Sequence, residues 1–103
     1  MADLANPFIA NVDRKMTDDE LIQALREDVV GELEAIMLYD AHVQATDNEK
    51  AKAVLSDIRD EEKVHMGELI TLIRHLDPDE AEFFKDGEDE VEELLEKVKQ
   101  GRL

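Results

Sequence analysis

Residues 49–76, EKAKAVLSDIRDEEKVHMGELITLIRHL, decide the fold of this chain. Along this stretch a seam of mostly apolar positions recurs at alternating steps of four and three residues, which is typical of a helix packed against another helix. The positions of the seam are Ala51, Leu55, Ile58, Glu62, His65, Leu69, Leu72 and Leu76. The stretch therefore predicts a long helix whose packing face carries a glutamate and a histidine among apolar residues.

A second seam with the same rhythm precedes this one in the sequence. It consists of Leu25, Val29, Glu32, Ile36, Tyr39 and Val43. It predicts a helix over residues 18–46 that begins at the capping-box pattern of Thr17 and Glu20. Thr46-Asp47-Asn48 separates the two helices, and so short a connection predicts that they pack antiparallel.

The remainder of the chain predicts shorter elements. Asp77-Pro78 ends the second helix, because proline disfavours helical geometry in the residue before it. Pro78 suits the start of a short third helix through Phe84 or Lys85, Asp86-Gly87 predicts a turn, and residues 88–100 predict a final acidic helix. The predicted fold is all-α, an antiparallel two-helix hairpin with short C-terminal helices. It divides the chain into an N-terminal arm (1–16), the hairpin (17–76) and an acidic C-terminal extension (77–103).

Composition limits the classes of function. The 103 residues make one small domain, and 28 acids against 12 bases give a net charge of −16. Such a charge argues against binding to nucleic acid or to an anionic membrane, and it favours cations or a basic partner. No apolar run approaches a membrane span and the N-terminus lacks a signal core, so we expect a soluble intracellular protein. The absence of cysteine excludes disulfides and thiolate metal sites.

Glu32, Glu62 and His65 occupy core positions by their spacing alone. An unpaired carboxylate in an apolar core is costly, and two of them with a histidine on facing seams need a common explanation. A metal ion supplies one, because Glu-x-x-His places both side chains on one helix face and a glutamate is long enough to bridge two ions. Oxygen and imidazole ligands suit iron, with manganese or zinc as possible substitutes.

The number of ligands predicts a dimer. A carboxylate di-iron bundle uses one glutamate from each of two helices and a Glu-x-x-His pair from each of the other two. This chain supplies one lone glutamate, Glu32, and one such pair, Glu62 with His65. Two chains related by a twofold axis would complete both the ligand set and a four-helix bundle.

Simpler interpretations stay open for individual residues. A lone core glutamate is commonly a satisfied or partly exposed group, and a lone Glu-x-x-His is a common chance match. Tyr39 is either a core tyrosine or a hydrogen-bond donor to a ligand carboxylate. Glu34 and Glu61 are either solvated surface or weak metal sites on the route by which metal enters.

The sequence resembles the encapsulated ferritins, a half-length ferritin-like family packaged in encapsulin nanocompartments. The resemblance covers roughly residues 17–96 and rests on GELEAIMLYD (31–40), RDEEKVHMGEL (59–69) and HLDPDEAEFFK (75–85). It implies that Glu32, Glu62 and His65 are iron ligands, that Tyr39 donates a hydrogen bond to a ligand carboxylate, and that Glu34 lies near the metal-entry route.

The resemblance also implies an activity and an assembly. The activity is that of a ferroxidase of iron storage, which oxidises Fe²⁺ with dioxygen at a di-iron centre shared by two subunits. The assembly is a ring of five dimers inside a cytoplasmic encapsulin shell, which receives the mineral. Two alternatives remain: a rubrerythrin-like di-iron peroxidase or oxidase, and a non-catalytic dimeric helical interaction module. Peroxide-dependent turnover would favour the first, and indifference to chelators the second.

Overall fold

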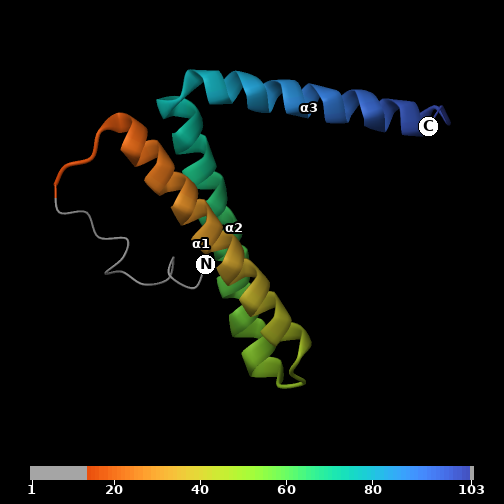
Figure 1. The fold of residues 1–103 in the computed structure, drawn as a ribbon. Coiled ribbons are helices and arrows are strands. Elements are labelled where there is room, and N and C mark those ends of the chain that lie inside the picture. Colours follow the sequence, from red (N-terminus) through yellow and green to blue (C-terminus); the bar gives the residue numbers. More distant parts are fainter. Residues whose placement is uncertain (1–13, 103) are drawn as a thin grey trace.

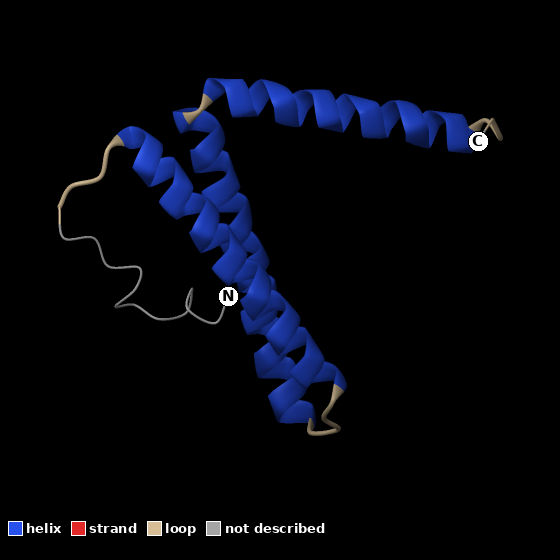
Figure 2. Ribbon diagram, viewed as in Figure 1, coloured by secondary structure: helices blue, strands red, loops and turns tan. Residues whose placement is uncertain are grey.

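The computed structural model describes residues 14–102, which form three helices and no strand. They are α1 (Asp18–Gln44), α2 (Glu49–Leu76) and α3 (Pro78–Lys99). Helices α1 and α2 lie side by side and antiparallel, and α3 leaves the end of α2 at a sharp elbow (Figures 1 and 2). The all-helical hairpin is thus confirmed. Most of the predicted N-terminal arm (residues 1–13) and Leu103 lie outside the described residues.

Side-chain caps begin all three helices. The Thr17 hydroxyl accepts a hydrogen bond from the Glu20 amide while the Glu20 carboxylate accepts one from the Thr17 amide, so the predicted capping box is present. Asn48 caps α2 through Ala51, and Asp77 caps α3 just before Pro78. Helix α1 ends at Gln44, two residues earlier than predicted, and the Thr46 hydroxyl accepts a hydrogen bond from the Asn48 amide in the loop.

The predicted turn at Asp86-Gly87 is wrong, because α3 runs without a break from Pro78 to Lys99. A glycine inside a helix costs about 1 kcal/mol relative to alanine, which is too little to stop a helix that is supported on both sides. Lys85 pairs with Asp89 at 3.3 Å across this position, and the Arg74 guanidinium lies 4.7 Å from the centre of the Phe84 ring. The two short C-terminal helices predicted from the sequence are therefore one long helix in the structure.

The buried core is small and lies near the elbow. Ile22, Leu25 and Ile73 are its buried members, with Leu21, Val29 and Leu69 packed against them. Arg26 of α1 lies beside this core and forms ion pairs with Glu80 at 3.1 Å and with Asp77 at 3.7 Å. The core and these ion pairs together hold the start of α3 against the hairpin.

The two predicted seams differ in how far they are buried. Every position of the seam on α1 is buried or partly buried, whereas His65, Leu72 and Leu76 of the seam on α2 are exposed. A straight α-helix drifts by about 20° per heptad against a strict seven-residue repeat. Toward the elbow the seam on α2 therefore turns partly away from α1, so that Leu69 stays partly buried while Met66, Ile70 and Ile73, outside the seam, are also partly or fully buried.

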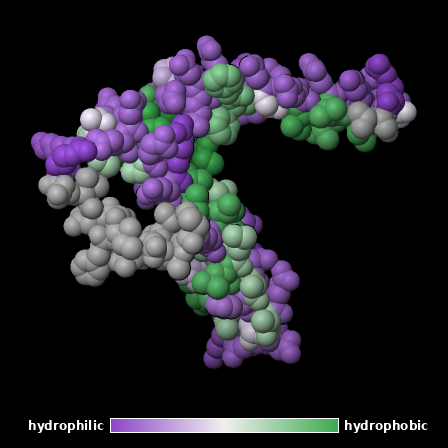
Figure 3. Space-filling view, in the orientation of Figure 1, coloured by the Kyte–Doolittle hydropathy of each residue, from purple (hydrophilic) through white to green (hydrophobic). Residues whose placement is uncertain are grey.

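Much apolar surface remains uncovered. Fifteen large apolar side chains are exposed among the described residues, against three that are buried. On α3 they form a stripe that includes Phe84, Val91, Leu94, Leu95 and Val98, and Figure 3 shows apolar surface along the side of α3 that faces the hairpin. Exposed apolar surface of this extent marks interaction sites in soluble proteins.

The described part of the chain is a flat, angular molecule with extents of 50 × 47 × 20 Å. None of the helices within residues 14–102 combines the length and the apolarity that crossing a membrane requires.

We expect Ile73→Ala to destabilise the chain strongly, by about 2–5 kcal/mol, because it empties the centre of a core with three buried residues. Urea unfolding followed by circular dichroism measures the change. Phe83→Ala is the matched control, since 74% of Phe83 is exposed and its removal should cost less than about 0.5 kcal/mol. Equal effects of the two substitutions would contradict this description of the core.

The start of α1 should weaken in acid. Hydrogen bonds from Arg14 and from Thr17 lower the pKa of Glu20 from its usual 4.5 to about 2. A carboxyl whose pKa is lowered by folding stabilises the folded state above the unfolded pKa, and this contribution disappears as the pH falls from about 4.5 to about 2. An NMR titration of the Glu20 side chain checks the value, and Glu20→Gln should remove this part of the pH dependence.

Candidate metal centre

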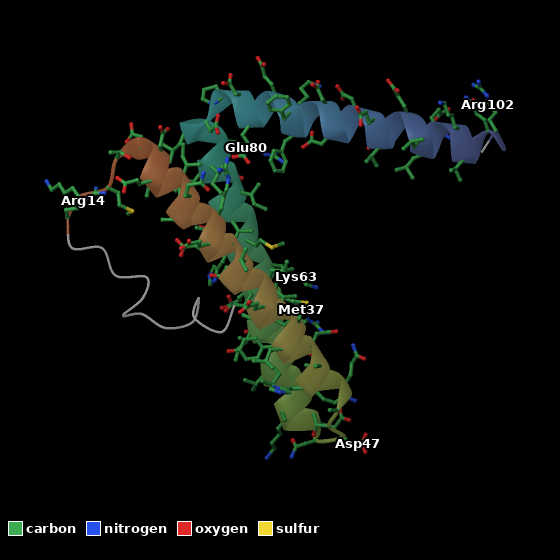
Figure 4. The ribbon with its side chains drawn as sticks, in the orientation of Figure 1. Arg14, Met37, Asp47, Lys63, Glu80 and Arg102 are labelled. Carbon is green, nitrogen blue, oxygen red and sulfur yellow. The ribbon has the colours of Figure 1, made fainter. Side chains whose placement is uncertain are left out.

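Helices α1 and α2 bring Glu32, Glu62 and His65 together near the middle of the hairpin. One donor atom from each lies within 4.8 Å of the others. The His65 Nδ1 atom lies 3.7 Å from a Glu62 oxygen and 3.9 Å from a Glu32 oxygen. In Figure 4 the labels of Lys63, which follows Glu62 in the sequence, and of Met37 mark this level of the hairpin. Within residues 14–102, no other group of three carboxylates or histidines has the spacing that a metal ion requires.

The helix geometry explains why these side chains meet. Glu62 and His65 are three residues apart on α2, so they project from the same face one turn apart. Glu32 stands on the seam of α1 that packs against α2, and the antiparallel arrangement places it at the level of both. The side chains of Glu32 and Glu62 are 23% and 21% exposed, whereas that of His65 is 50% exposed. The imidazole therefore lies at the open edge of the cluster.

The donor set fits a divalent metal ion. The Glu32 Oε2 atom is buried and has no hydrogen-bond partner, although leaving a buried acceptor unpaired costs about 1–3 kcal/mol. A cation at this point would satisfy that oxygen and would reduce the repulsion between the two carboxylates. Two carboxylates and one imidazole are ligands that iron, manganese and zinc accept.

A groove of about 410 Å³ opens beside the cluster. Its lining residues include Glu32 and Glu62 together with Glu27, Asp28, Gly31 and Ala35. Asp28 and Glu27 were missed from the sequence, although Asp28 lies four residues before Glu32 and therefore on the same side of α1. The groove is consequently acidic as well as open on its outer side.

The other residues predicted for the site lie around the cluster and not within it. Tyr39 is partly buried two turns along α1 from Glu32, and it is not one of the three residues that the cluster contains. Glu34 and Glu61 are exposed, as their positions off the seams predicted. The roles of Tyr39 and Glu34 stay predictions.

An ion pair links the two helices one turn before Glu62. Arg59 Nη1 donates a hydrogen bond to Asp40 Oδ1 of α1 at 2.8 Å, and Arg59 Nε donates one to Asp60 at 3.1 Å. The hydrogen bonds to Asp60 and then to Asp40 raise the pKa of Arg59 above its usual value. Asp40 lies one residue after Tyr39, outside both seams, so its partner could not be identified from the hydrophobic pattern.

Two known proteins have sequences similar to this chain. The cargo protein EncC of the encapsulin nanocompartment of Myxococcus xanthus (strain DK1622) is 49% identical over 81 residues, which are 79% of this chain and 62% of that protein. A ferritin-like–encapsulin shell fusion protein of Pyrococcus furiosus is 38% identical over 89 residues, which are 86% of this chain and 26% of that protein. The chain thus spans less than two thirds of the length of either relative.

The crystal structure of the encapsulated ferritin domain from Pyrococcus furiosus matches with a TM-score of 0.78 at 38% identity. The match covers 86% of this chain and 91% of that one, and it agrees with the all-helical fold described above. The sequence model of the EncFtn-like family matches residues 9–87, which include both helices of the hairpin and all three clustered residues. The chain therefore belongs to the EncFtn-like family.

Proposed function

We propose that this protein is a ferroxidase of iron storage, which oxidises Fe²⁺ with dioxygen at a centre held by Glu32, Glu62 and His65. The observation that carries the proposal is the meeting of these three side chains, with a buried oxygen of Glu32 left without a partner. The name and fold of the encapsulated ferritin domain support it. Membership of the family by itself says only that the protein is ferritin-like and related to encapsulin cargo.

The centre is completed by a second copy of the chain. One chain contributes two carboxylates and one imidazole, which is half of the set found in di-iron helical bundles. His65 lies at the open edge of the cluster, and exposed apolar residues such as Val54 and Leu72 lie on the same side of α2. A twofold dimer would cover this side and bring together four carboxylates and two imidazoles.

In this proposal Fe²⁺ is the substrate, and the protein supplies its binding site. Glu32 and Glu62 provide negative charge that favours the more highly charged Fe³⁺, while the His65 imidazole offers a nitrogen ligand. Two Fe²⁺ ions give up one electron each, and dioxygen accepts both electrons together with two protons from the solvent, which gives two Fe³⁺ ions and hydrogen peroxide. The acidic groove lined by Glu27 and Asp28 raises the local concentration of cations beside the centre.

We further propose that the product is stored in an encapsulin compartment in the cytoplasm. Two relatives support this partner, since one is named as an encapsulin cargo protein and the other as a fusion of a ferritin-like part to an encapsulin shell. The exposed apolar surface on α3 is consistent with assembly of dimers into a larger ring. A ring without a closed cavity would leave mineral storage to the shell.

Metal binding should stabilise the folded protein. A ligand that binds only the folded state adds about 2.7 kcal/mol at a concentration of 100 times its Kd, so Co²⁺ should raise the midpoint of thermal unfolding. Glu62→Gln should remove this increase because it deletes a charged ligand. Glu93→Gln, which deletes an exposed charge on α3, should keep it. A similar increase in both variants would show that Co²⁺ binds to surface acids.

Anaerobic titration with Fe²⁺, followed by admission of air, tests the ferroxidase itself. We expect one pair of iron ions per two chains and rapid oxidation, which the absorbance of Fe³⁺ reports. Glu32→Ala and His65→Ala should abolish the rapid phase, and Glu93→Ala should retain it. Near-normal oxidation by the first two variants would refute the assignment. Iron bound without oxidation would indicate surface sites, and no saturable binding would favour a helical interaction module.

A further inference from the structure

Arg59 is a potential competitor of the metal at Glu62. The two residues are three positions apart on α2, so their side chains are neighbours on the helix surface. Both lie partly within the contact with α1, and each side chain is 21% exposed. A guanidinium is always charged and matches a carboxylate with two parallel hydrogen bonds. If it were free to turn, Arg59 would occupy the carboxylate that the centre needs.

Two aspartates hold the guanidinium elsewhere. Asp60 accepts from Arg59 Nε at 3.1 Å, which leaves the terminal nitrogens to find another acceptor. Asp40 of α1 supplies it, since its Oδ1 atom accepts from Arg59 Nη1 at 2.8 Å. The Oδ2 atom of Asp40 accepts from Gln44 at 2.7 Å, so Asp40 itself is held in place. Within residues 14–102, the ion pairs of Arg59 are with Asp40 and Asp60 and not with Glu62.

We propose that Asp40 is a positioning residue, which keeps the Arg59 guanidinium away from Glu62 and so leaves this carboxylate available to a divalent cation. The proposal rests on the proposed function, because it takes Glu62 as a ligand. It differs from a purely structural role in one respect. A simple cross-link between α1 and α2 is broken equally by removing either partner, whereas here only the loss of Asp40 releases a competitor.

Titration of the full chain with Co²⁺ by calorimetry distinguishes the two roles. Asp40→Asn should weaken Co²⁺ binding by about tenfold, because a charged hydrogen bond from Arg59 to Glu62 must be broken first. Arg59→Gln should bind Co²⁺ at least as tightly as the wild type. The double variant Asp40→Asn/Arg59→Gln should return to within about threefold of the wild type, since the competitor is gone.

The matched control is Asp89→Asn, which removes the same charge from an ion pair with Lys85 on α3, away from the hairpin. Its affinity for Co²⁺ should equal that of the wild type.

The proposal is overturned if Arg59→Gln or the double variant binds as weakly as Asp40→Asn. It is also overturned if Asp40→Asn binds like the wild type, or if Asp89→Asn loses as much affinity as Asp40→Asn. Should Asp40→Asn fail to fold, Asp40→Ser, which also removes the carboxylate, replaces it alone and together with Arg59→Gln, with the same expected loss of affinity and the same recovery. Wild-type protein that binds no Co²⁺ would refute the proposed function instead.

Discussion

The middle of this hairpin depends on the cost of holding two carboxylates between two packed helices. Glu32 and Glu62 stand where a helical pair would ordinarily place leucine, and water reaches only about a fifth of each side chain. Like charges this close repel each other, and a buried oxygen without a partner adds to the cost. A cation bound between them would turn this unfavourable arrangement into a binding site. The imidazole at the open edge adds the one nitrogen donor of the cluster.

This constraint also affects where the buried core of the hairpin can lie. Its buried residues, Ile22, Leu25 and Ile73, all lie toward the elbow, and the polar cluster occupies the level where the core would otherwise continue. The Arg59–Asp40 pair lies on the other side of the cluster, toward the loop. The cluster is thus held between an apolar contact and an ion pair. Fifteen large apolar side chains are exposed within residues 14–102, so much of the apolar surface of the described helices is not covered by the chain itself.

Helix α3 illustrates a limit of local sequence signals. Asp86-Gly87 predicts a turn because glycine is a poor helix former, yet neighbouring contacts decide whether its small cost matters. Those contacts come from Lys85 with Asp89 and from Arg74, which lies over Phe84 and 3.4 Å from Glu88. The two contacts of Arg74 join α2 to α3 across the elbow, so their effect could not be estimated from residues 78–99 alone.

The sequence by itself determined the two long helices, their antiparallel pairing and the identity of the three clustered residues. The helices and the clustered residues follow from periodicity and capping, which are local properties of a helix with a constant rotation per residue, and the antiparallel pairing follows from the short connection between the helices. Tertiary structure alone decided that His65 lies at the edge while Glu32 and Glu62 lie inside, because that difference depends on how far the seam of α2 rotates away from α1. It also decided that Arg59 binds Asp40 of α1 in addition to its sequence neighbour Asp60, because only the packing of the two helices brings Asp40 within reach of the guanidinium.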